Sequence, residues 1–189
     1  IGAPFSPLGH DARVRSKGAT CIALPTTQPV QPARNTGELM RKDNLEQPFA
    51  PIYNYALVTD AMEGLILVDI NTLADGEFRN NRLTRALTWN PGGVLAGARH
   101  VTIGGNVAYV IANAGLVIVD LTDPLAPKTL ATVPLVQGRA SALQFRYLFV
   151  TDSDGLKVVD VTQPAQARMV PAATLPLASA RGVFAARKA

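Results

Sequence analysis

The chain has 189 residues, 48% hydrophobic and 17% charged, so it can bury a core and is too apolar to be disordered throughout. Its net charge is +4, but the basic residues are scattered with few aromatic residues among them, which argues against a nucleic-acid partner. No apolar run approaches the roughly 18 residues needed to span a membrane. The single cysteine, Cys21, cannot form an internal disulfide, and no metal or haem-attachment motif surrounds it. We expect neither a bound metal nor a cofactor.

Residues 1–50 differ in composition from the rest of the chain. Six prolines interrupt them, and no hydrophobic period of two or 3.6 persists. Proline fixes φ and lacks a donor N–H, so we predict an irregular, Pro-rich arm. Thr36 could cap a short helix through about Asn44. We expect the arm to pack over the rest of the chain or over another chain.

From residue 51 onward the chain repeats one short apolar run. The copies read GLILVDIN from Gly64, GLVIVDLTDP from Gly115 and GLKVVDVTQP from Gly155. Each is rich in β-branched residues, begins with glycine, and ends in a carboxylate followed by a turn, a pattern typical of a buried strand. The second and third copies align at a constant offset of 40 residues, whereas an insertion around 80–93 separates the first copy from the second.

Each full repeat predicts four strands. Both faces of the central strands are apolar, so each sheet must be covered on both sides. Four-stranded antiparallel sheets that recur about every 40 residues are typical of a β-propeller, and we predict this all-β fold. The predicted strands are Tyr55–Thr59 and Leu65–Ile70 in the first repeat, and Arg99–Ile103, Val107–Ile111, Leu116–Leu121 and Lys128–Val133 in the second.

These tracts resemble a known repeat. The stretch GNVAYVIANAGLVIVDLTDPLAP is similar to the LVIVD repeat of bacterial and archaeal surface proteins, as are RYLFVTDSDGLKVVDVTQPAQA and YALVTDAMEGLILVDINTL. The resemblance covers about residues 51–177. The first copy departs from the pattern, because Leu73-Ala74 stands where proline is expected. The resemblance implies a propeller that is exported to the periplasm, the cell surface or the medium, and it implies no shared catalytic residues.

The predicted domain from 51 to 189 is an incomplete propeller. Three blades cannot close a ring, since propellers typically have four to eight. We expect the missing blades in the same polypeptide or in another chain, and favour the first. The blades are predicted at about 51–96, 97–137 and 138–178, and residues 179–189 resemble the start of another.

Three aspartates, Asp69, Asp120 and Asp160, end equivalent strands. A carboxylate at this place can accept hydrogen bonds from the following turn. Catalytic acid–base work needs one distinctive environment, and repetition argues against that. We predict structural turns and no catalytic residue. The sequence Asp152-Ser153-Asp154-Gly155 has some features of a calcium loop but lacks its distal ligands, so we interpret it as a polar turn.

Arginines recur at the start of the strand predicted to lie nearest the channel. Arg99 and Arg139 are equivalent, Arg181 lies two residues out of register, and His100 follows Arg99. Guanidinium groups that converge at a channel mouth would bind an anion or a carboxylate. In the alternative interpretation, each arginine hydrogen-bonds the loops of a neighbouring blade.

The sequence favours a non-catalytic scaffold or protein-interaction module within a larger exported or cell-surface protein or assembly. Its contact surface would include the loops of the blades, among them 80–93. One alternative is an enzyme whose channel binds an anionic substrate through Arg99, Arg139 and His100. Another is a structural partner in an electron-transfer assembly in which other domains carry haem.

Overall fold

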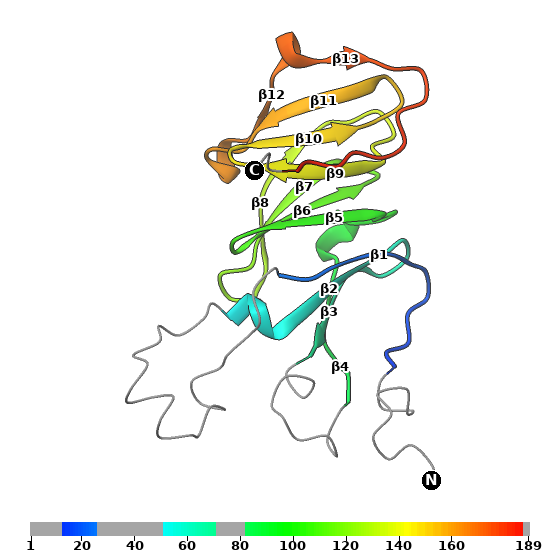
Figure 1. Ribbon diagram of the computed structural model, residues 1–189. Helices are drawn as coiled ribbons and strands as arrows, with labels where there is room; N and C mark the ends of the chain where they lie inside the picture. The colour runs from blue at the N-terminus through cyan, green and yellow to red at the C-terminus, as the bar shows by residue number, and fades with distance from the viewer. Residues whose placement is uncertain (1–12, 26–50, 71–81, 187–189) are drawn as a thin grey trace.

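The computed structural model describes residues 13–25, 51–70 and 82–186. These residues form three antiparallel sheets that stack on one another (Figure 1). The first sheet has the order β1 (Ala19–Ala23), β2 (Tyr55–Asp60), β3 (Gly64–Asp69) and β4 (Thr84–Trp89). The second has β5 (His100–Gly104), β6 (Val107–Ala112), β7 (Gly115–Asp120) and β8 (Lys128–Val133). The third has β9 (Ala140–Gln144), β10 (Tyr147–Thr151), β11 (Gly155–Asp160) and β12 (Arg168–Met169), and β13 (Leu175–Pro176) also pairs with β11.

Short 3-10 helices lie in the connections between strands. They are η2 (Pro51–Asn54), η4 (Pro91–Gly93), η5 (Pro164–Gln166) and η6 (Pro171–Ala173). The strands predicted from the second repeat are confirmed to within one residue at either end, and the three sheets are blades of an incomplete β-propeller. Within the described residues, no helix has the length and apolarity to cross a membrane.

The prediction of an irregular arm is wrong for residues 19–23. These residues form β1, which pairs antiparallel with β2 so that Cys21 lies opposite Thr59 and Ala23 opposite Leu57. Five residues are too few to show a period, and the hydrogen bonds that hold them extended come from a strand far along the chain. The first blade therefore begins before residue 51. The short helix predicted from Thr36 lies outside the described residues.

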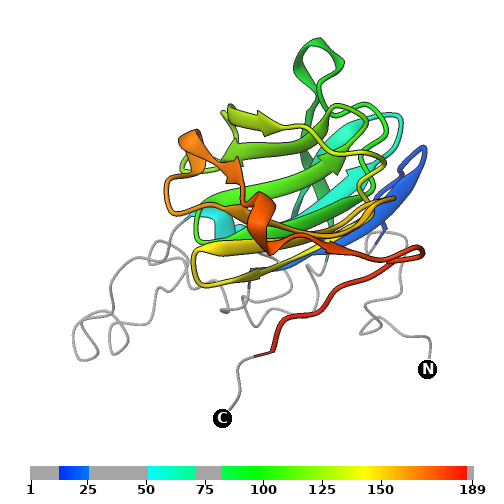
Figure 2. The ribbon, with the colours of Figure 1, turned by 90° about the horizontal axis from the view of Figure 1, so that it is seen from above.

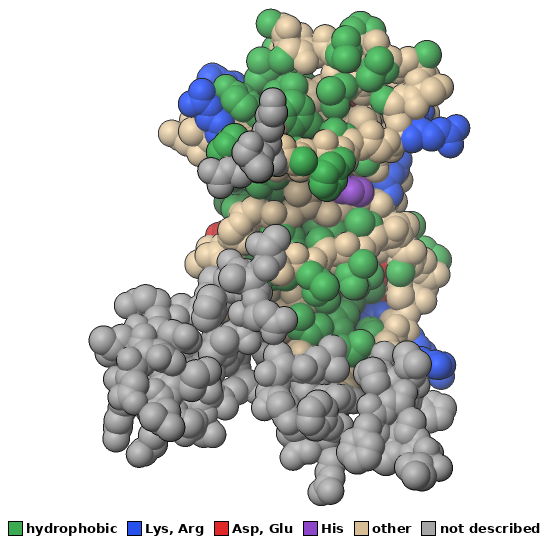
Figure 3. Space-filling model, viewed as in Figure 1, with side chains coloured by type: hydrophobic (Ala, Val, Ile, Leu, Met, Phe, Trp, Pro, Cys, Tyr) green, Lys and Arg blue, Asp and Glu red, His purple; other side chains and the backbone are tan. Residues whose placement is uncertain are grey.

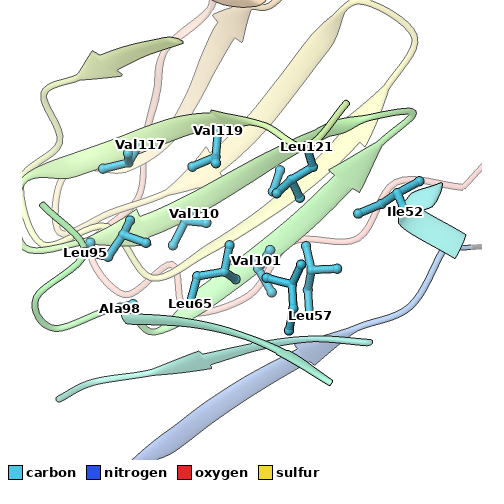
Figure 4. Packing of buried hydrophobic residues seen from close by; sticks show 13 residues of the cluster. Ile52, Leu57, Leu65, Leu95, Ala98, Val101, Val110, Val117, Val119 and Leu121 are labelled. Carbon is cyan, nitrogen blue, oxygen red and sulfur yellow. The ribbon is translucent and has the colours of Figure 1, made fainter. Parts of the chain in front are cut away.

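Side chains from facing sheets form one layer of core between each pair of blades. Between the first two sheets, Leu57 and Leu65 point toward Val101, Val110 and their neighbours (Figure 4). Between the second and third sheets, the layer contains Ile111, Leu116, Ile118, Leu148, Val150 and Val159. The central strand β7 is therefore buried on both faces, as its continuous apolar sequence predicts. On β3, Leu65 and Leu67 face the second blade, and Ile66 and Val68 on the opposite face are 1% and 5% exposed in a separate cluster.

The glycine that opens each repeat has a backbone role. Gly115 has φ +118° and Gly155 has φ +142°, a region that residues with a Cβ rarely adopt. A Cβ on Gly115 would also overlap the carbonyl oxygen of Val133, and one on Gly155 would overlap that of Leu175. The G of GLxxVD is thus required by the tight turn and by the close approach of the outer strand.

One strand of each sheet lies at the same edge of the stack. These innermost strands are β1, β5 and β9, with β1 beside β5 and β5 beside β9 (Figures 1 and 2). After β13, the chain turns back and residues 180–186 run next to β9. This C-terminal tail, residues 178–186, occupies the place where the innermost strand of a following blade would lie.

Candidate functional site

The start of each innermost strand carries a residue in an equivalent position. Equivalent positions are identified by how each innermost strand pairs with the second strand of its blade. Cys21 lies opposite Thr59 and His100 lies opposite Ile111, and these two pairs occupy the same place in their hairpins. Thr20 in the first blade is therefore equivalent to Arg99 in the second, and Arg139 is equivalent to Arg99 in the third.

Each of these residues donates a hydrogen bond to the chain that enters the next blade. Thr20 Oγ1 donates to the carbonyl of Ala98 at 2.9 Å, and Arg99 Nη1 donates to that of Gly138 at 3.4 Å. Arg139 Nη1 donates to the carbonyl of Ala180 at 2.6 Å. Each acceptor directly precedes an arginine in the sequence: Ala98 precedes Arg99, Gly138 precedes Arg139 and Ala180 precedes Arg181. We call these three bonds the latch.

The guanidinium of Arg99 has further partners on the protein. Its Nε donates to the carbonyl of Gly97 at 3.1 Å, and its Nη2 donates to Asn113 Oδ1. These two contacts hold the side chain against loops of its own blade, whereas the bond to the Gly138 carbonyl reaches the chain that enters the third blade, as the alternative interpretation of the arginines expects. Binding of an anion by Arg99 and Arg139 stays a prediction, and an anion would compete with these carbonyls for the N–H donors.

His100 also links two blades. Its Nδ1 accepts the N–H of Ser141 at 3.3 Å and lies 3.2 Å from the Ser141 hydroxyl oxygen. Thr102 contacts the same serine: its Oγ1 donates to the Ser141 carbonyl oxygen at 3.1 Å and lies 2.8 Å from the Ser141 hydroxyl oxygen. Burial lowers the pKa of His100, so the ring is neutral at pH 7 and adds no positive charge to this edge.

The structure brings only part of the predicted cationic group into the latch. Arg99, His100 and Arg139 lie at the same end of adjacent strands, and each contacts the next blade or the tail. Arg181 follows the Ala180 acceptor but is exposed, and within the described residues no hydrogen bond involves its side chain. It takes no part in the latch.

Two of the repeated aspartates organise turns at the opposite ends of their blades from the latch. Asp120 Oδ1 accepts the Thr122 hydroxyl at 2.7 Å and its N–H at 2.8 Å. Asp160 Oδ1 accepts the Thr162 hydroxyl at 2.6 Å and its N–H at 3.0 Å. The bonds from these threonines lower the pKa of both carboxyls. The turn after Asp69 lies outside the described residues.

Asp120→Ala is expected to lower the free energy of unfolding by about 1 kcal/mol, because a partly exposed turn loses two hydrogen bonds. Urea denaturation at pH 7 would measure the change. Thr122→Ala keeps the backbone bond and should lose less. An unchanged transition midpoint for Asp120→Ala would show that this carboxylate does not hold the turn.

Two buried aspartates were not recognised as a pair from the sequence. Asp60 is fully buried at the end of β2, and it accepts the N–H groups of Gly18, Met62 and Glu63 at 2.7–2.8 Å and the hydroxyl of Ser16. Burial alone would raise the pKa of Asp60, but these hydrogen bonds outweigh it and hold the pKa well below its usual range. The shared tracts YALVTD and YLFVTD contain the signal that could have found this position.

Asp152, the second member of this pair, holds the polar turn of the third blade. Its Oδ1 accepts the N–H groups of Asp154 at 2.9 Å and Gly155 at 3.1 Å, and Lys157 Nζ lies 3.8 Å from Oδ2. These are the contacts of a structural turn. Across residues 13–25, 51–70 and 82–186, no cluster of three or more His, Cys, Asp or Glu side chains is placed to hold a metal ion.

Comparison with known families agrees with this repeat structure. The model of the LVIVD repeat matches residues 53–75, 97–133 and 142–171. The first match covers β2 and β3 but not β1, which lies far earlier in the chain. A comparison with curated proteins finds no match.

Proposed function

Because the chain is an LVIVD-repeat protein, we propose that it is a non-catalytic propeller scaffold that binds other proteins. The latch carries the proposal. The polar side chains at the inner edge, where a channel site would lie, donate to the backbone of the next blade or of the C-terminal tail, and His100 is neutral and bound to Ser141. This edge is built to join blades.

The loops supply the proposed contact surface. Several turns expose large hydrophobic side chains: Phe145 is 79% exposed, Met62 69%, Val136 56% and Leu125 53%. Phe145 and Leu125 lie on the rim opposite the latch. Variable loops on rigid sheets commonly carry binding, and single exposed apolar residues on such loops can anchor a partner.

The proposal includes an exported or cell-surface location within a larger protein or assembly. It rests on the resemblance to LVIVD repeats of surface proteins. Fractionation of the source cells with an antibody against the chain would test the location independently of the binding role.

Titration of the full chain with phosphate and with citrate at pH 7 is expected to give no saturable heat, because the arginine donors already have carbonyl partners. Arg99→Ala should instead lower the free energy of unfolding by about 1–2 kcal/mol, since it leaves the carbonyl of the buried Gly138 without this donor. Arg181→Ala is the control and should leave stability unchanged. Millimolar or tighter phosphate binding that Arg99→Ala abolishes would contradict the scaffold and favour a channel site.

A further inference from the structure

The turn between β9 and β10 carries an exposed aromatic residue in an unfavourable backbone conformation. Gln144 pairs with Tyr147, so Phe145 and Arg146 form the turn, and we call residues 144–147 the Phe145 turn. Phe145 has φ +55°, a region that bulky residues rarely adopt. Its side chain is 79% exposed and belongs to none of the core clusters that the described residues form. Folding therefore gains little from an aromatic residue at this point.

The matching turn of the second blade shows that this position always points into solvent. The same strand pairing makes Gly105 the counterpart of Phe145. Gly105 has nearly the same φ, +58°, and is exposed although blades lie on both sides of its sheet. A Cβ added there would meet nothing within 4 Å. The exposure of Phe145 therefore does not depend on whether a further blade follows the third.

Arg146, the second residue of the turn, has a guanidinium group that is oriented but has donors to spare. Its Cζ lies 5.2 Å from the centre of the Tyr147 ring, a cation–π contact. Its carbonyl accepts the N–H of Val161 at 2.9 Å, which ties the turn to the end of β11. Across the part of the chain that the structure describes, the guanidinium makes no hydrogen bond and no ion pair. Its N–H donors can therefore bind an outside acceptor.

The carboxylate of Asp160 lies near this turn but is engaged by other groups. Asp160 pairs with Tyr147 across the sheet. Its Oδ1 accepts the Thr162 hydroxyl and N–H, and its Oδ2 lies 3.8 Å from Arg168 Nη2. The bonds from Thr162, and after them the charges of Arg168 and Arg146, lower the pKa of Asp160. Figure 3 shows Lys and Arg side chains at the end of the third blade where the turn lies in Figure 1.

We propose that the Phe145 turn is the anchor by which the chain binds a partner protein, and that the partner presents a carboxylate beside an apolar pocket. The Phe145 ring enters the pocket, and the Arg146 guanidinium donates to both oxygens of the carboxylate, an arrangement that its planar shape favours. Aromatic residues and arginine are enriched in protein interfaces. This inference rests on the proposed function, since it assigns the surface and the partner chemistry of a scaffold that binds proteins.

A membrane surface fits the turn less well than a protein does. Membrane binding grows with the apolar area that is buried and with the number of basic residues near the lipid. One phenylalanine and two exposed arginines, Arg146 and Arg168, supply little of either, and Asp160 would face anionic phosphates. A protein pocket that encloses the ring, in contrast, can take most of its affinity from one or two side chains.

Photo-crosslinking in the source cells tests which surface meets a partner. The probe p-benzoylphenylalanine takes the place of Phe145 in the full chain, and in a matched chain it takes the place of Met62, which is exposed on a turn at the latch end. Irradiation should join position 145 to one protein, at a segment that contains Asp or Glu next to apolar residues. Position 62 should not join to that segment.

Calorimetry of the purified partner with the full chain then measures what the turn contributes. Phe145→Gly copies the second blade and should raise the dissociation constant roughly tenfold or more, while the urea midpoint stays equal or rises because glycine tolerates a positive φ. Arg146→Ala should weaken binding to a similar extent, and Arg146→Lys should restore little of it, since an ammonium cannot pair with both oxygens. Met62→Ala and Arg181→Ala are the controls and should bind as the wild type does.

The outcomes separate a failure of the anchor from a failure of the scaffold. If the partner binds Phe145→Gly and Arg146→Ala as tightly as the wild type, the anchor is overturned while protein binding stands. If neither position joins to any protein, both proposals are overturned. Cosedimentation of the full chain with phosphatidylglycerol vesicles that Phe145→Gly abolishes would assign the turn to a membrane and also overturn the anchor.

Discussion

Leu116→Ala is expected to lower the free energy of unfolding by about 3–4 kcal/mol, the size found when a fully buried leucine leaves a cavity. Leu116 is 0% exposed on β7, in the core layer between the second and third blades. Strands with fixed hydrogen bonds cannot close around the missing atoms, so most of the lost packing remains unfilled. Urea denaturation followed by circular dichroism would measure the change.

Leu125→Ala makes the same chemical change on an exposed turn. Leu125 is 53% exposed, and its truncation should alter the free energy of unfolding by less than about 1 kcal/mol. Equal losses for the two variants would mean that the layer between the second and third blades is not a packed core.

Asp60→Asn is expected to lower the free energy of unfolding at pH 7 by about 3 kcal/mol. An amide keeps one acceptor oxygen but turns an NH₂ group toward donors, so buried N–H groups lose their partner. The pKa of Asp60 is lowered in the fold, so the carboxylate stabilises the native state above its unfolded pKa of about 3.9 and this contribution is lost as the pH falls through the folded value.

The pH dependence of stability separates this role from a packing effect. The wild type should lose stability from about pH 5 downward, and Asp60→Asn should show a shallower decline, so that the two curves approach each other in acid. Asp123→Asn is the control, since that exposed carboxylate accepts a single N–H at 3.1 Å. Parallel curves for wild type and Asp60→Asn would contradict a charged Asp60 in the fold.

Much of the fold could be predicted because the repeat supplies its own evidence. The tract GLVIVD has apolar residues on both faces and a glycine at its start, and both features have a direct cause in β7, which is buried on two sides and begins at φ +118°. The strand β1 could not be predicted in the same way. Its pairing with β2 depends on residues far along the chain, and five residues among prolines show no pattern of their own.

For the candidate site, the sequence predicted where the arginines lie in their blades but not which atoms they contact. The spacing of Arg99 and Arg139 places them at the same point of successive blades, and the structure agrees. Which oxygen each guanidinium reaches depends on how one blade is placed against the next, and no local pattern encodes that. The same holds for Asp60, whose donors Ser16 and Gly18 belong to a segment separated from it by more than forty residues.

The wide separation of β1 from β2 has a consequence for how the chain folds. Two residues join β5 to β6, whereas β1 ends at Ala23 and β2 begins only at Tyr55. Each doubling of loop length adds about 0.6 kcal/mol to the entropic cost of closing the loop. Closing the connection between β1 and β2 therefore costs roughly 2 kcal/mol more than closing the two-residue turn between β5 and β6. The hairpins of the later blades can therefore nucleate early, and the first blade is completed last, by a strand that arrives from a distance.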